Sequence, residues 1–276
     1  LSMARYSLPL GAATILGQLT LQSHSIIVSS ICTPDEFAVY INGATQVPIV
    51  GIITGSIATV ILSEMSFFCA KGDKPVALEL FRKASIKSAC VLFPVTCFLF
   101  VTATQFITLL YSEKYEASVT PFRIYLLILP IRIVVYGSAL MALGLTRAIL
   151  IRSIFDFLIN ALLCWVLVRT IGYIGAPIAL ALTLYLWTTP FNLLRIGQGF
   201  GVHWRETLPM DSLLKIALAC IACIPLALLG SYGFDIPPIA RMALAGFLYL
   251  VPVVFLFNYM GHLNLVNIRN KLRKVI

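Results

Sequence analysis

The feature that most constrains this chain is the stretch 120–144, TPFRIYLLILPIRIVVYGSALMALG, which is apolar around one central arginine, Arg132. A hydrocarbon core about 30 Å thick is crossed by about 20 helical residues, so this stretch is long enough to span a membrane. A charge at the centre of such a span costs about 2.5–3.5 kcal/mol, and it is therefore usually shielded inside a helix bundle or a water-filled cavity. Arg132 is the first candidate for a functional residue.

The composition indicates a polytopic membrane protein. Of the 276 residues, 60% are hydrophobic and 11% are charged, whereas a soluble globular domain carries about 25% charged residues. The net charge of +9 is spread over the connections between apolar runs and forms no single basic patch. We therefore expect no nucleic-acid partner.

Seven cysteines lie in or beside the apolar runs, and Cys220 and Cys223 have the spacing of a redox or zinc motif. No second pair and no histidine accompanies them, so we expect buried, unreactive cysteines, no metal site and no cofactor. The sequence starts almost directly at an apolar run, and we therefore expect it to be part of a longer chain.

We predict an all-α fold, a polytopic bundle of about eight transmembrane helices. Each predicted span is an apolar run of about 18–27 residues that is bounded by proline, glycine or charged residues. The eight runs are 8–32, 38–64, 86–111, 119–143, 148–168, 173–195, 213–231 and 239–259.

The distribution of basic residues predicts the orientation of these spans. The connections 65–87, 144–152 and 195–215, together with the two chain ends, hold 15 of the 20 lysines and arginines. Basic connections stay in the cytoplasm, so we expect both termini of this chain to be cytoplasmic.

The longest basic connection contains an amphipathic segment at 73–85. Asp73 followed by Pro75 indicates a helix start, and Leu78 and Phe81 recur at helical spacing. We expect a short helix that lies on the inner leaflet, with its basic residues on anionic headgroups. The alternative is an ordinary charged loop.

Polar side chains form a stripe along the first span. Steps of three or four residues place them on one helix face, and they are Thr14, Gln18, Gln22, Ser25 and Ser29. His24 lies off this stripe, and we expect a packed, hydrogen-bonded residue there, with a proton-relay role as the alternative. The second span begins with Asn42 and Gln46, four residues apart.

The fourth span carries two arginines to which we assign different roles. Tyr125, Arg132 and Tyr136 lie on nearly one helix face. Arg123 lies near the end of the span, and we expect it to be an anchor at the membrane interface.

The fifth and sixth spans add further polar stripes. Arg152, Asp156 and Asn160 share one face of the fifth span. Asp156 lies at about the depth of Arg132, so it is the best candidate counter-ion for Arg132, and Arg152 is the other partner within its reach. The sixth span carries Tyr185, Thr188 and Asn192 at helical spacing.

Polar stripes on four spans, together with a midplane arginine and aspartate, favour a hydrated cavity. The alternative is that these side chains join helix to helix by hydrogen bonds worth about 0.6 kcal/mol each. Spans seven and eight lack such stripes, and we interpret them as lipid-facing additions to a six-helix unit.

Four segments carry a resemblance to a known family: LPLGAATILGQL at 8–19, LLYSEKYEASVTPFRIYLLILPIRI at 109–133, GSALMALGLTRAILIRS at 137–153 and GYIGAPIALAL at 172–182. In this order they resemble the C-terminal half of bacterial oligosaccharide flippases of the O-antigen and capsule type. These are polysaccharide biosynthesis proteins of the multidrug/oligosaccharidyl-lipid/polysaccharide exporter superfamily.

The resemblance implies two six-helix lobes and a peripheral helix pair. Residues 1–200 would form the second lobe, and residues 201–276 the two peripheral helices and a basic tail. It implies a transporter of the bacterial inner membrane, not an enzyme, that moves undecaprenyl-diphosphate-linked oligosaccharide to the outer leaflet by alternating access. Protons or sodium would be the coupling ion, and membrane lipids and polysaccharide-assembly proteins would be partners.

We expect cationic, amide and phenolic side chains to bind such a substrate. Arginine suits phosphate because of its planar donor fork, and amides suit hydroxyl-rich cargo. The candidates are Arg132, Gln18, Gln22, Asn42, Asn160, Tyr125, Tyr136 and Asn192. Asp156 and Arg152 are expected to act as counter-ions or in ion coupling, and no catalytic residue is expected.

Three alternatives remain at this point. A drug or metabolite exporter of the same superfamily would favour acidic cavity residues for cationic substrates. A membrane-embedded glycosyltransferase, polymerase or ligase would need a sizeable loop or an acidic cluster at the membrane face. A purely structural membrane subunit would need no aligned polar stripes.

Overall fold

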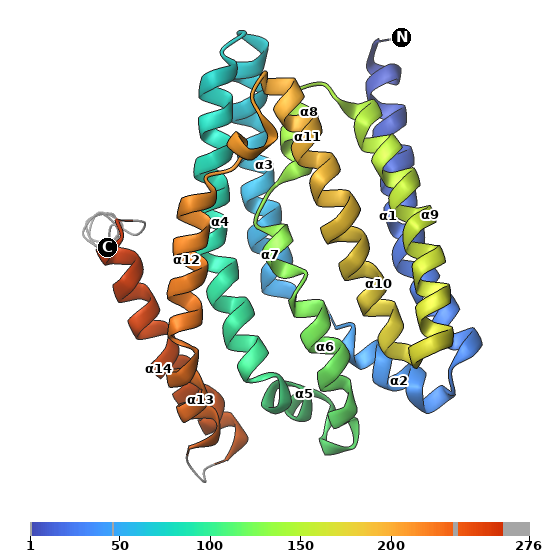
Figure 1. Ribbon diagram of the computed structural model, residues 1–276, viewed down its shortest axis with the longest axis vertical. Coiled ribbons are helices and arrows are strands. Elements are labelled where there is room, and N and C mark those ends of the chain that lie inside the picture. Colours follow the sequence, from blue (N-terminus) through green and yellow to red (C-terminus); the bar gives the residue numbers. More distant parts are fainter. Residues whose placement is uncertain (1, 46, 234–236, 262–276) are drawn as a thin grey trace.

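The computed structural model describes residues 2–45, 47–233 and 237–261, which form helices and no strand (Figure 1). The predicted all-α class is therefore confirmed. The helices are α1 (Ser2–Ile31), α2 (Pro34–Gly43), α3 (Pro48–Ala70), α4 (Lys74–Val101), α5 (Ala103–Tyr111), α6 (Val119–Leu126), α7 (Leu129–Arg132), α8 (Tyr136–Ala142), α9 (Thr146–Ile171), α10 (Gly175–Thr183), α11 (Thr189–Phe200), α12 (Met210–Ala222), α13 (Ile224–Tyr232) and α14 (Pro238–Tyr259).

The described part of the chain contains six helical runs that are long and apolar enough to cross a membrane, which makes this a multi-pass membrane protein. They are Val50–Ala70, Lys74–Val101, Glu113–Ala142, Thr146–Phe200, Met210–Tyr232 and Pro238–Tyr259. Two features explain why six runs stand against eight predicted spans. The run Thr146–Phe200 reverses at Gly172, where α9 ends, so that α10 packs back along α9. The 30-residue α1 is long enough, but its polar stripe lowers its hydropathy.

Four predicted spans are broken instead of continuous, and one of them, 213–231, divides into α12 and α13 at Cys223. The stretch 38–64 divides into α2 and α3, because Pro48 starts a new helix and restricts the residue before it. Asn42 therefore lies at the end of α2, and Gln46 lies outside the described residues. The stretch 86–111 breaks at Thr102, and 119–143 divides into α6, α7 and α8.

The segment 73–85 is neither a separate surface helix nor a loop. Asp73 caps the start of α4, where its side chain accepts a hydrogen bond from the Val76 amide. The apolar residues Ala77, Leu78 and Phe81 are buried, because this segment is the first part of α4 and packs into the bundle. The segment is helical with one apolar face, as its amphipathic pattern predicts. That face packs against other helices instead of lying on the membrane surface.

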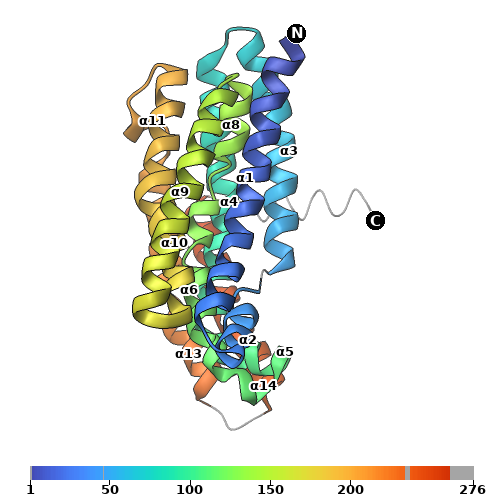
Figure 2. The same ribbon diagram turned by 90° about the vertical axis from the view of Figure 1, so that its right-hand side faces the viewer.

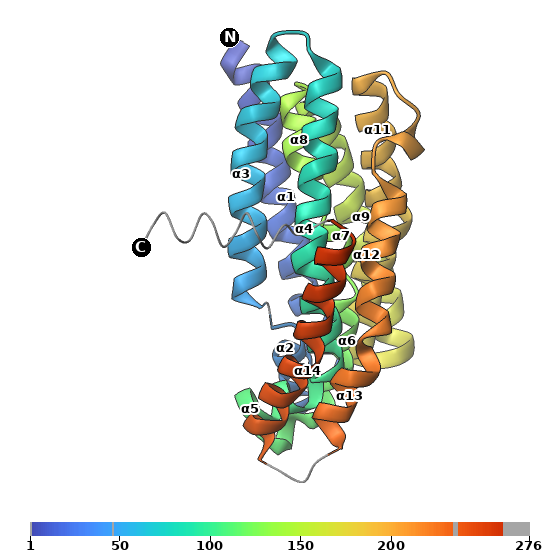
Figure 3. The ribbon, with the colours of Figure 1, turned by 90° about the vertical axis from the view of Figure 1, so that its left-hand side faces the viewer.

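The long helices stand roughly parallel, and the connections gather at two ends (Figure 1). The N-terminus lies at the same end as the α3–α4, α8–α9 and α11–α12 connections, which are the basic ones. Within the bundle, α1 packs along α9, and α3 packs along α4 and α8. The helices α12 to α14 pack on α4 and α5 and form the left-hand edge of the molecule in Figure 1, which faces the viewer in Figure 3.

The end opposite the N-terminus is covered by the short helices α2 and α5 (Figures 1 and 2). α2 begins with a capping box between Thr33 and Glu36, which satisfies its first free amides. Its last residue, Gly43, lies so close to the start of α6 that an added Cβ would be 2.5 Å from Pro121 Cγ and 2.8 Å from the Ser118 carbonyl oxygen. α2 is therefore seated directly on α6.

This contact predicts that Gly43→Ala destabilises the protein. The added methyl group must push α2 from α6, and overpacking of this kind costs about 1–3 kcal/mol. Gly55→Ala is the matched control, because nothing lies within 4 Å of its added Cβ and alanine is about 0.5–1 kcal/mol better than glycine inside a helix. Thermal melting in detergent should show a loss for the first variant only. Equal melting temperatures of the Gly43→Ala and Gly55→Ala variants would contradict the close contact between α2 and α6.

Candidate functional site: a polar cavity beside a broken helix

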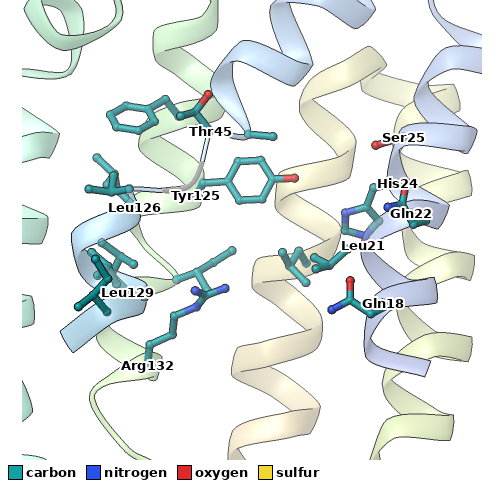
Figure 4. Close-up of a pocket in the computed structure, with 18 residues that line it drawn as sticks. Gln18, Leu21, Gln22, His24, Ser25, Thr45, Tyr125, Leu126, Leu129 and Arg132 are labelled. Carbon is teal, nitrogen blue, oxygen red and sulfur yellow. The ribbon is translucent and has the colours of Figure 1, made fainter. Parts of the chain in front are cut away.

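A cavity of about 560 Å³ opens between α1, the α2–α3 joint, and the α6–α7 segment (Figure 4). Gln18, Gln22 and His24 lie on one side of it, and Tyr125 and Arg132 lie on the other. The full lining is Gln18, Leu21, Gln22, His24, Ser25, Ala44, Thr45, Val47, Val50, Gly51, Ile52, Phe122, Tyr125, Leu126, Ile128, Leu129, Arg132 and Leu180.

The α1 wall follows directly from helical spacing. Gln18, Gln22 and Ser25 are four and three residues apart, so an unbroken helix brings all three to the cavity. The two ends of the predicted stripe do not reach it: the Thr14 hydroxyl donates to the Leu10 carbonyl at 2.9 Å, and the Ser29 hydroxyl donates to the Ile26 carbonyl at 3.1 Å.

The opposite wall depends on the break between α6 and α7. Pro130 has no N–H, and the Ile131 amide bonds to the Ile128 carbonyl at 3.1 Å, so the Leu127 carbonyl loses its helical partner. The Tyr185 hydroxyl, from the neighbouring α10–α11 segment, donates to this carbonyl at 2.6 Å. A side chain thus replaces the missing backbone bond and holds the helix in its broken form.

A second break follows Arg132 directly. Val135 has ψ of 60°, outside the helical region, and the Tyr136 amide bonds to the Val134 carbonyl at 2.9 Å instead of continuing the helix. Irregular backbone at membrane depth is tolerated only where it is buried in protein or lines a cavity. Ile133, Val134 and Val135 are buried. Arg132, at the end of the four-residue α7, is exposed toward the cavity.

The Arg132 guanidinium keeps its donors free. Among the described residues, no hydrogen bond or ion pair engages it, and no aspartate or glutamate lines the cavity. The Tyr125 hydroxyl lies on the same wall, 3.2 Å from the hydroxyl of Tyr40 in α2. Tyr136 does not join them, because it lies beyond the second break and is 8% exposed.

Asp156 and Arg152 lie in a separate polar cluster between α9 and the α10–α11 segment. The Arg152 Nε is 3.2 Å from Asp156 Oδ2, and the Thr188 hydroxyl donates to Asp156 Oδ1 at 2.8 Å. Arg152 also donates to the Asn192 side-chain oxygen at 3.4 Å. The Asp156 carboxylate is therefore the partner of Arg152. Among the described residues Asp156 does not pair with Arg132, the partner that its depth in the membrane predicts.

The remaining candidates lie outside the cavity. Asn160 is fully buried behind the α1 wall, where it hydrogen-bonds His24 and Thr183. Asn42 lies in α2 and does not line the cavity. Arg123 donates to the Phe100 carbonyl at 3.2 Å, so the two arginines of this span have separate environments.

The cavity also contains residues that the sequence did not single out as ligands. His24, which we expected to be packed, is 1% exposed and yet lines the cavity. Thr45 lies between α2 and α3 and also lines the cavity. Pro48 favours the start of a new helix, so the sequence can predict the α2–α3 joint. No pattern in the sequence indicates that residues of this joint lie across the cavity from α1.

The fold and this cavity together define a polytopic, all-α membrane protein with a polar pocket among its helices. Residues 1–120 match the model of a family described as polysaccharide biosynthesis proteins, which supports that family. The matched part includes Gln18, Gln22 and Thr45, and Arg132 lies beyond it. The comparisons with curated proteins and with solved structures return no match.

The Tyr185–Leu127 bond predicts that Tyr185→Phe is destabilising. Removal of the hydroxyl leaves the Leu127 carbonyl without a partner at membrane depth, which costs about 1–3 kcal/mol. Tyr173→Phe is the matched control, since no hydrogen bond of the Tyr173 hydroxyl is found among the described residues. Unfolding free energies in mixed micelles should fall for the first variant only. An equal loss of unfolding free energy in both variants would show that the Tyr185–Leu127 hydrogen bond does not stabilise the break between α6 and α7.

The polar cluster predicts energetic coupling between Asp156 and Arg152. Their side chains are 19% and 20% exposed, and contacting residues of this kind couple by about 0.5–3 kcal/mol. A double-mutant cycle with Asp156→Asn and Arg152→Gln should measure such a coupling in unfolding free energy. The parallel cycle with Arg132→Gln should give a value within about 0.5 kcal/mol of zero. Coupling to Arg132 instead would place the carboxylate at the cavity.

Proposed function

We propose that this protein translocates a diphosphate-linked oligosaccharide lipid across the bacterial inner membrane for surface polysaccharide biosynthesis. The chain acts as one lobe of the transporter, by alternating access, with protons or sodium as the coupling ion. It carries out no covalent chemistry on the cargo.

The observation that carries this proposal is the asymmetry of the cavity. Arg132, with its free donors, lies on one wall, and Gln18 and Gln22 lie on the other. A phosphate needs charge-assisted donors, and the planar guanidinium supplies two at once. Amide side chains both donate and accept, which suits sugar hydroxyls.

The charged residues that line the cavity favour an anionic cargo over a cationic one. Among the 18 described residues around the cavity, one is an arginine and none is an aspartate or glutamate. A cationic substrate would meet uncompensated repulsion from Arg132, whereas an anionic group would gain from it.

The family match supports the polysaccharide context, because it covers the helices that form the α1 side of the cavity. Of the four segments that resemble oligosaccharide flippases, it covers 8–19 and the first part of 109–133. A polymerase or ligase acting on the same lipid-linked sugars would need an acidic cluster at its site, and among the described residues no aspartate or glutamate lines the cavity.

The test is to replace Arg132 in the full-length protein, in the native cell, and to measure surface polysaccharide. Arg132→Ala should remove most of it, because a hydrogen bond to a charged group is worth about 1.5–3 kcal/mol, or about 10- to 100-fold in affinity. Arg132→Lys should retain part, since it keeps the charge and loses the fork.

Arg123→Ala is the matched control, because it removes an arginine of the same span that bonds the Phe100 carbonyl. It should leave export unchanged. Normal export by both Arg132 variants, at normal protein levels, would overturn the proposal.

A further inference from the structure

A chain of hydrogen bonds runs from the cavity wall into the protein interior. The His24 Nε2 bonds Asn160 Oδ1, Asn160 Nδ2 bonds Thr183 Oγ1 at 3.3 Å, and Thr183 Oγ1 bonds the Ala179 carbonyl at 2.8 Å. It joins α1 to α9 and α9 to α10. Asn160 is 0% exposed and Thr183 is 2% exposed, so water does not compete for these groups.

The far end of this chain determines the direction of every bond in it. A backbone carbonyl can only accept, so the single proton of the Thr183 hydroxyl goes to Ala179. The hydroxyl must therefore accept from the NH₂ group of Asn160. This orients the amide so that its oxygen faces His24, and the Nε2 of His24 must carry a proton.

The other ring nitrogen of His24 is thereby left as an acceptor. His24 lines the cavity although it is 1% exposed, so only an edge of the ring reaches it. Among the described residues, nothing bonds its Nδ1. The ionisable groups that share the cavity are Tyr125 and Arg132, and the charge of Arg132 opposes a second positive charge on the ring.

We propose that His24 is a specificity-determining residue whose Nδ1 accepts a hydrogen bond from a hydroxyl of the cargo's sugar. Asn160 and Thr183 are positioning residues that select the ring tautomer. Because His24 and Arg132 lie on opposite sides of the cavity (Figure 4), a ligand between them has its anionic group at α7 and its hydroxyl group at α1. The proposal rests on the proposed function.

The tautomer can be measured without any substrate. In ¹⁵N-histidine spectra of the full-length protein, the signals of His24 are those that His24→Gln removes. We expect the Nε2–H form at neutral pH, and a mixture of tautomers in Thr183→Val, which frees the Asn160 amide to turn over. The Nδ1–H form, or a doubly protonated ring, in the unchanged protein would overturn the proposal.

The role in specificity is tested by binding of two probes to the protein in detergent: a prenyl diphosphate disaccharide and the sugar-free prenyl diphosphate. His24→Gln keeps a polar group near the Nε2 position and loses Nδ1, whereas His24→Asn keeps a polar atom near Nδ1. We expect His24→Gln to weaken binding of the disaccharide probe about five- to tenfold and to leave the sugar-free probe unchanged. His24→Asn should weaken it less.

The outcomes separate the two proposals. Binding of both probes by the unchanged protein, with no effect of His24→Gln on either, would overturn the role of His24 and leave the transport proposal standing. Binding of neither probe by the unchanged protein would overturn the cargo class itself, and the role of His24 with it.

Discussion

The structure depends on how one interrupted helix satisfies its backbone. In a membrane every amide and carbonyl must find a partner within the protein, so a proline at mid-span requires a substitute donor. The Tyr185 hydroxyl supplies it to the Leu127 carbonyl. With that bond in place, α6 and α7 can differ in direction, and Arg132, two residues after Pro130, lines the cavity.

Two charged sites in this membrane protein are accommodated in different ways. The charge of Arg152 is compensated locally by Asp156, and Thr188 is a second donor to the carboxylate, so both charges of this cluster have a partner within the protein. Arg132 has no such partner among the described residues and faces a cavity. A charge at membrane depth without a partner is costly, and under the proposed function the anionic group of the cargo would supply that partner.

Residue positions could be predicted from the sequence where a helix is continuous, and not where it is broken. Gln18 and Gln22 were placed correctly on one cavity wall because α1 is continuous from Ser2 to Ile31. The same counting failed for Tyr136, since the break after Arg132 turns it into the core. Depth alone also suggested the wrong partner for Asp156: α9 packs on α1 and α10, whereas α7 packs on α4, and no linear pattern reveals such neighbours.

The question whether polar stripes line a cavity or join helices is answered residue by residue. Asn160 uses its amide to bond His24 and Thr183, and Asn192 accepts from Arg152, so both join helices. Within the described residues Gln18 and Gln22 make no side-chain hydrogen bond and face the cavity. Sequence composition treats these amides alike. The physical distinction is whether the hydrogen-bonding capacity is used inside the protein or left open toward the cavity. His24 connects the two sets, because its Nε2 bonds Asn160 and the residue also lines the cavity.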